Sequence, residues 1–271
     1  MPSNPETQAE DYELLPSDPQ TADENPQKAD MGLAEQLEKG ERRQGDDIAR
    51  YTALGASAVT LVVTWFVMLI NNPAQVGWFL LHPTLESLAM LFFTYGILTL
   101  QPTSQPRTKA AGLSRHQSAI VFMAFPALLI GVCAIVMNKF ELGKRHFRSW
   151  HSVLGIIATG WIIIQISIGG ASVWFGGKAF GGGMKAKAVW KYHRLSGYIL
   201  FPLLLVTVDL GGALSHWGEK NVPLPIRMVA YVFAPLSLQD EVFLIRISVA
   251  LHVTNLISTP AQIRVTLHPH R

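Results

Sequence analysis

Four histidines stand near the starts of four consecutive apolar stretches: His82, His116, His151 and His193. Successive members are 34, 35 and 42 residues apart, each about the length of one membrane-spanning helix of roughly 20 residues plus a loop. Because the chain reverses direction with every crossing, histidines at helix starts must alternate between the two faces of a bilayer. We therefore expect His82 and His151 to share one face, and His116 and His193 to share the other.

Two imidazoles at one depth on facing helices can be the axial ligands of one haem iron. A single histidine at a helix end more often contacts interfacial water, but four that pair by depth indicate two metal centres. Gly155 and Gly197 each follow a histidine by four residues and leave room for a porphyrin on the same helix face. Cys133 is the chain's single cysteine, so no Cys-x-x-Cys-His motif exists and any haem must be held noncovalently.

The elements that position these histidines are long apolar runs. Of the 271 residues, 49% are hydrophobic and only 15% are charged, which is typical of a membrane protein. We predict an all-α polytopic membrane protein with six transmembrane helices, in which a central four-helix bundle carries both haems. The spans are expected at 52–70, 80–100, 116–137, 149–174, 193–217 and 242–260. Pro126 and Pro202 should kink the third and fifth helices.

The sixth span contains Arg246, and residues 224–236 form a shorter apolar segment that competes with it. That competitor is too short to cross, so we expect it to be interfacial or re-entrant. Residues 1–48 read as a disordered tail without a signal peptide, 49–263 as the membrane domain and 264–271 as a C-terminal tail. Fourteen lysines and arginines flank the spans on one side and six on the other, so both termini should be cytoplasmic.

Basic side chains gather near the histidines on both faces. On the cytoplasmic face they would suit an anionic electron donor, although the ordinary cytoplasmic excess of positive charge explains them equally well. On the other face they would suit an anionic acceptor, with contact to lipid headgroups or haem propionates as the alternative. The cytoplasmic candidates are Arg115, Lys187, Lys191 and Arg194, and the opposite ones are Lys144, Arg145, His146 and Arg148.

Three charged residues fall inside apolar spans: Glu86, Asp209 and Arg246. Ionised side chains in hydrocarbon usually pair, face the bundle interior or carry function. Counting along the helices places all three in the layer of His82 and His151. We expect Arg246 to be neutralised by Asp209, Glu86 or a haem propionate. A Glu86 without a cation should be protonated. We favour a structural role for it, and the alternative is that it couples proton uptake to reduction of the nearby haem.

Residues 80–218 resemble the cytochrome b561/ferric reductase transmembrane family. The resemblance depends on the histidine spacing, on the His82-Pro83 pair and on the sequence SWHSVLG around His151. It implies a six-helix fold with two haem b groups, one held by His82 and His151 and one by His116 and His193. Ascorbate-reduced members carry an apolar-basic motif at the end of the second span, where this chain has GILTLQPTSQPRTKAAG. Ascorbate is therefore a candidate donor without a motif match.

The expected function is transmembrane electron transfer from a cytoplasmic donor, ascorbate or another small anionic reductant, to a non-cytoplasmic acceptor. Monodehydroascorbate and a ferric chelate are the candidate acceptors, which would make the protein an ascorbate-dependent or ferric reductase. One alternative is a non-redox transporter or scaffold whose histidines are interfacial or bind another metal. Another is a haem-containing anchor for a soluble redox partner. The lipid bilayer is the expected environment, and nucleic acid is not an expected partner. The sequence is compatible with a homodimer and does not distinguish between endomembrane, vacuolar and plasma membranes.

Overall fold

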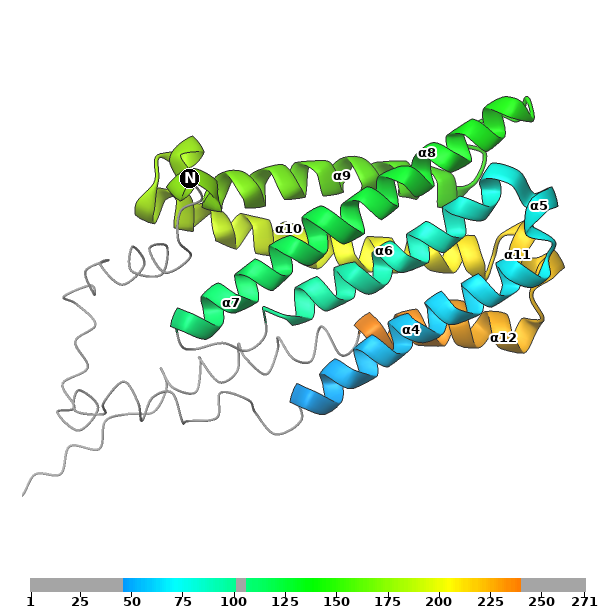
Figure 1. Ribbon diagram of the computed structural model, residues 1–271, viewed down its shortest axis with the longest axis horizontal. Helices are drawn as coiled ribbons and strands as arrows, with labels where there is room; N and C mark the ends of the chain where they lie inside the picture. Colours follow the sequence, from blue (N-terminus) through cyan, green and yellow to red (C-terminus); the bar gives the residue numbers. More distant parts are fainter. Residues whose placement is uncertain (1–45, 101–105, 240–271) are drawn as a thin grey trace, which may run out of the picture.

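Helices make up the regular structure of the part of the chain that the computed structural model describes, residues 46–100 and 106–239 (Figure 1). Five of these helices are long and apolar enough to cross a membrane: 47–70, 74–98, 108–141, 150–180 and 183–212. The prediction of an all-α polytopic membrane protein is confirmed. The predicted sixth span at 242–260 and most of the N-terminal tail lie outside the described residues.

The first two membrane helices are α4 (Asp46–Ile70) and α6 (Leu81–Leu98), joined by α5 (Pro73–Val76) and the 3-10 turn η2 (Gly77–Leu80). The third is a continuous rod of α7 (Pro106–Gln117), the π-helical η3 (Ser118–Ala124) and α8 (Phe125–Glu141). The fourth and fifth are α9 (Trp150–Val173) and α10 (Gly183–Gly212), joined by η4 (Trp174–Phe180). The chain continues through α11 (His216–Asn221) and α12 (Leu224–Met228) into the π-helical η5 (Val229–Phe233).

Two helices begin earlier than their apolar runs. The third rod starts at Pro106 and α10 starts at Gly183, so His116 and His193 lie about three turns inside their helices. Their predicted position at helix starts is wrong, because polar residues on an exposed helical extension need no apolar face and hydropathy does not register them. His82 and His151 do lie in first turns.

The two prolines act differently. Pro126 has no N–H to donate to the preceding turn, and the turn before it is π-helical, with the Phe125 N–H donating to the Ile120 carbonyl five residues back. The helix thus meets the proline with a wider turn, which is a known source of local bending. Pro202 lies inside α10, which runs unbroken across it.

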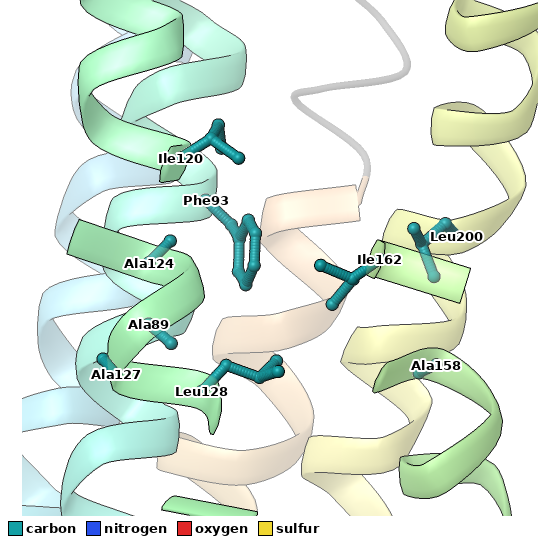
Figure 2. Close-up of a cluster of buried hydrophobic side chains, with 9 residues drawn as sticks. All are labelled: Ala89, Phe93, Ile120, Ala124, Ala127, Leu128, Ala158, Ile162 and Leu200. Atoms are coloured by element: carbon teal, nitrogen blue, oxygen red, sulfur yellow. The ribbon is translucent and has the colours of Figure 1, made fainter. Parts of the chain in front are cut away.

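Four helices surround the centre of the molecule. The rod α7–η3–α8 packs along α6, α9 packs along α10, and α4 covers the other side of α6 (Figure 1). The buried cluster at mid-depth joins the two helix pairs: Phe93 and Leu128 come from α6 and α8, and Ile162 and Leu200 come from α9 and α10 (Figure 2). We name this cluster the middle layer, because histidines lie on both sides of it.

The helical segment 224–239 packs against the bundle along one face. Thr60 Oγ1 of α4 donates to the Ala230 carbonyl at 2.8 Å, and Thr64 Oγ1 lies 3.1 Å from the Tyr231 hydroxyl. Leu238 is buried in a cluster that also contains residues of α4, α6 and α10. The sequence predicts that residues 224–236 are interfacial or re-entrant. The contacts with α4 count against a purely interfacial position, and the re-entrant course stays a prediction. Its course after Gln239 lies outside the described residues.

Gly212 tests this packing, because a Cβ there would collide with the Tyr231 ring. Gly212→Ala should push Tyr231 off α10, weaken its contact with Thr64 and destabilise the fold by about 1–3 kcal/mol, the usual cost of overpacking. The measurement is the melting temperature of the purified protein in detergent. Gly160→Ala is the matched control, because no atom lies within 4 Å of a Cβ there. An equal melting temperature in both variants would contradict the assignment.

Candidate functional site

The structure brings the four histidines together as two pairs. The ring centres of His82 and His151 are 5.9 Å apart, and those of His116 and His193 are 6.4 Å apart. With a metal–nitrogen bond of about 2 Å and a ring nitrogen about 1 Å from its ring centre, two imidazoles on one metal have centres about 6 Å apart. Both separations therefore suit a single metal ion between each pair. We name the pairs the His82 level and the His116 level.

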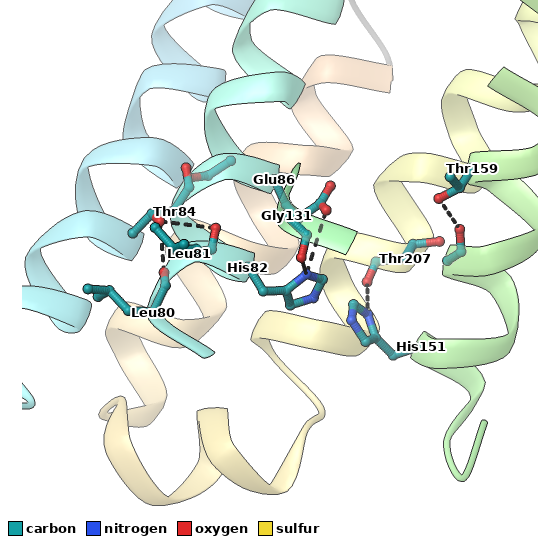
Figure 3. A network of polar contacts seen from close by, with 11 residues as sticks. Leu80, Leu81, His82, Thr84, Glu86, Gly131, His151, Thr159 and Thr207 are labelled. Atoms are coloured by element: carbon teal, nitrogen blue, oxygen red, sulfur yellow. Dashed lines mark hydrogen bonds and ion pairs between the residues drawn. The ribbon is translucent and has the colours of Figure 1, made fainter. Parts of the chain in front are cut away.

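Backbone carbonyls orient both rings of the His82 level. His82 Nδ1 lies 3.1 Å from the Gly131 carbonyl oxygen, and His151 Nδ1 lies 2.9 Å from the Thr207 carbonyl oxygen (Figure 3). A carbonyl can only accept, so each Nδ1 carries the proton and donates. The proton-free nitrogen is then Nε2, which is the form of histidine that binds a metal.

At the His116 level one ring has the same arrangement. His116 Nδ1 lies 3.0 Å from the Gly96 carbonyl oxygen. His193 is held through its backbone instead, because the Gln165 side-chain amide donates to the His193 carbonyl oxygen. The His193 ring lies against Gly169, where a Cβ would come within 2.7 Å of the ring. Only glycine allows that approach. Gly211 lies against the His151 ring in the same way, since a Cβ at position 211 would come within 2.6 Å of the ring.

These contacts follow one rule: each of the four central helices carries one histidine and, near its other end, the backbone that contacts a histidine of its packing partner. His82 and Gly96 are 14 residues apart on α6, about 21 Å at 1.5 Å per residue. His151 and Gly169 are 18 residues apart on α9, about 27 Å. The two levels therefore stand most of a bilayer's hydrocarbon thickness apart, with the middle layer between them.

The residues fit haem iron. Within residues 46–100 and 106–239, no group of three or more His, Cys, Asp or Glu side chains could hold a metal ion. A metal at either level would therefore have two side-chain ligands, which is what a porphyrin iron requires in addition to its ring nitrogens. His82 and His151 would hold one haem, and His116 and His193 would hold the other.

Several predicted neighbours lie elsewhere. Gly155 and Gly197 face the side chains of Thr207 and Gln165 on the adjacent helix, so they serve contact between α9 and α10. Among the aromatic residues of the central helices, Phe93 is buried in the middle layer, and Phe92, Phe125 and Trp161 pack against it. Phe122 is 69% exposed, and Phe201 belongs to a cluster that faces α4.

Glu86 and Asp209 lie at the His82 level, as the sequence predicts. Glu86 Oε1 is 3.6 Å from His82 Nδ1. Asp209 lies on the last turns of α10, between the two residues that contact His151. Arg246 lies outside the described residues, so its neutralisation stays a prediction.

The basic side chains expected to meet substrates are all exposed at the ends of the bundle. Lys144, Arg145, His146 and Arg148 occupy the α8–α9 connection beside the His82 level, and Arg115, Lys187, Lys191 and Arg194 lie on α7 and α10 near the His116 level. Exposure makes each set available to an anion in solution or to lipid headgroups.

Sequence reasoning found the four histidines but missed the carbonyls and glycines that orient them. The signal for the glycines was the pair of Gly-Gly doublets near the ends of α9 and α10, Gly169-Gly170 and Gly211-Gly212. A carbonyl acceptor has no sequence signal, because every residue supplies one.

Comparison with known proteins agrees with this geometry. The chain is 32% identical over 123 residues to the bovine (Bos taurus) protein named transmembrane reductase CYB561D2, a match covering 44% of this chain and 55% of the relative. The human relative of that name is also 32% identical over 123 residues, with the same coverage. Transmembrane ascorbate ferrireductase 2 of Arabidopsis thaliana is 26% identical over 163 residues, 58% of this chain and 69% of the relative.

The chain thus spans about half the length of the mammalian relatives it matches. A family profile described as eukaryotic cytochrome b561 matches residues 77–218, more than half of the chain, and includes all four histidines. The chain therefore belongs to the eukaryotic cytochrome b561 family.

Proposed function

We propose that this protein transfers electrons across a membrane through two b-type haems, one at the His82 level and one at the His116 level. The observation that carries the proposal is the pair of imidazole–imidazole separations, 5.9 and 6.4 Å, at two levels of one apolar bundle. Membership of the cytochrome b561 family supports it, because the family implies b-type haem. A bound haem supplies a one-electron couple whose potential depends on its axial ligands and surroundings.

The protein's own residues hold the ligands and exclude water. Carbonyls of neighbouring helices keep Nδ1 protonated on three of the histidines, so that Nε2 faces the metal. The middle layer of Phe93, Leu128, Ile162 and Leu200 separates the two levels with apolar side chains. Such a layer gives ions no polar path between the levels, while electron transfer through packed protein needs none.

The charged rims favour anionic substrates at both ends. We assign the donor to the cytoplasmic end, where Lys187, Lys191 and Arg194 form an exposed basic rim on α10, extended by Arg115 on α7. Ascorbate fits this rim as a small anion, and the Arabidopsis relative is named a transmembrane ascorbate ferrireductase. At the other end, the rim from Lys144 to Arg148 would receive monodehydroascorbate or a ferric chelate.

The histidine assignment predicts a pattern of haem loss. His82→Ala or His151→Ala should remove one haem, and His116→Ala or His193→Ala should remove the other, because a single axial imidazole binds haem more weakly than two. The measurement is haem content per protein together with the reduced-minus-oxidised spectrum. His146→Ala is the control, since this exposed loop histidine should leave both haems in place. Full occupancy of both haems in any of the four variants would remove that residue from the ligand set.

The rim assignment predicts separate effects on donor and acceptor. The triple variant Lys187→Ala, Lys191→Ala, Arg194→Ala should raise the KM for ascorbate severalfold at low salt, with the difference shrinking as added salt screens the charge. The matched variant Lys144→Ala, Arg145→Ala, Arg148→Ala removes the same charge from the other rim and should raise the KM for ferric citrate only. Both are measured in vesicles that hold the donor on one side and the acceptor on the other. Unchanged donor KM in the first variant would exclude that rim as the donor site.

A further inference from the structure

A carboxyl group lies beside a proposed haem ligand inside the membrane-spanning part of the chain. Glu86 follows His82 by one helical turn on α6, and its Oε1 lies 3.6 Å from His82 Nδ1. That distance is too long for a hydrogen bond, so the contact is electrostatic. Glu86 Oε1 is buried and has no hydrogen-bond partner within the described residues. In surroundings of low polarity, such an oxygen acts on its neighbour far more strongly than it would in water.

The space for this carboxyl group is built by Gly131 on α8. A Cβ at position 131 would lie 2.7 Å from Glu86 Oε1 and 3.4 Å from the His82 carbonyl oxygen. The carbonyl oxygen of the same glycine lies 3.1 Å from His82 Nδ1. Gly131 therefore provides both the acceptor that orients the ring and the room for a carboxyl oxygen beside it (Figure 3).

The two levels differ in this respect. At the His116 level, His116 Nδ1 contacts the Gly96 carbonyl. The side chain that hydrogen-bonds to the His193 backbone is the neutral amide of Gln165. At the His82 level, a carbonyl and a carboxyl oxygen both face the same Nδ1. Groups that face the outer nitrogen of a metal-bound histidine change how strongly its inner nitrogen binds the metal.

We propose that Glu86 is a positioning residue that acts through His82 to lower the reduction potential of the haem at the His82 level. The inference rests on the proposed function. A buried carboxyl oxygen beside Nδ1–H, whose lone pairs face the ring, increases electron density in the imidazole and makes Nε2 a stronger ligand, which favours ferric over ferrous iron. The result is a stronger reductant at the end of the bundle assigned to the acceptor.

The test is a spectroelectrochemical titration of both haems in the full-length protein at one pH, with Glu86→Gln and Glu86→Leu as variants. Glu86→Leu keeps most of the volume without oxygen, and Glu86→Gln keeps one acceptor oxygen. At a fixed solution potential, Glu86→Leu should raise the reduced-to-oxidised ratio of the haem at the His82 level on the order of tenfold, which is 59 mV for one electron. Glu86→Gln should give a smaller rise, and the other haem in the same molecule should keep its potential.

Gly131→Ala provides a second route to the same contact, because the added methyl group would displace the carboxyl group without removing it. It should raise the potential of the same haem. Asp209→Asn is the control, since it removes an acid of the same level that has no contact with His82, and its effect should be smaller than that of Glu86→Gln.

Unchanged potentials in both Glu86→Leu and Gly131→Ala, with both haems present, would overturn the inference, as would an effect of Asp209→Asn equal to that of Glu86→Gln. Either result leaves the proposed function intact. Absence of haem from the wild-type protein would overturn the proposed function instead.

Discussion

A buried imidazole N–H must find an acceptor, and within a membrane bundle the nearest acceptors are backbone carbonyls. Helical carbonyls already accept one hydrogen bond each, but their second lone pair is available where the neighbouring side chain is absent or turned away. Gly96 and Gly131 supply such carbonyls to His116 and His82, and Thr207 supplies one to His151. The direction of Nε2 in these three histidines follows from the bonds, so the geometry of both histidine levels depends on how closely the helices approach.

Close approach in turn determines which helices must be neighbours. His82 of α6 contacts a carbonyl of α8, and His116 of α7 contacts a carbonyl of α6. His151 of α9 contacts a carbonyl of α10, while the His193 ring of α10 lies against Gly169 of α9. Antiparallel pairing makes this exchange possible, since it places the start of one helix beside the end of the other. The remaining elements, α4 and the segment 224–239, support the centre from one side, through the polar contacts of Thr60 and Thr64 and the buried Leu238.

Much of this architecture could be predicted from the sequence, because apolar length and the alternation of direction are enough to pair four histidines by depth. The helix ends could not, since α7 and α10 extend through polar residues that hydropathy discounts. The π-helical turn before Pro126 depends on how freed backbone groups find partners. The contacts of residues 224–239 could not be predicted, because the Ala230 carbonyl and the Tyr231 hydroxyl bond to side chains of α4 about 170 residues away in the sequence. The glycines beside His151 and His193 could be seen as doublets, but their purpose depends on contacts between helices.

The distance between the two levels has an electrical meaning. A step of about 21 Å along α6 covers roughly two-thirds of a hydrocarbon layer about 30 Å thick, so a charge moving between the levels crosses about that share of the membrane voltage. At about 2.3 kcal/mol per charge for each 100 mV, this amounts to about 1.5 kcal/mol per electron, or roughly tenfold in the equilibrium between the two levels. If electrons pass between the levels in the proposed direction, an interior-negative membrane would favour their outward transfer and oppose their return.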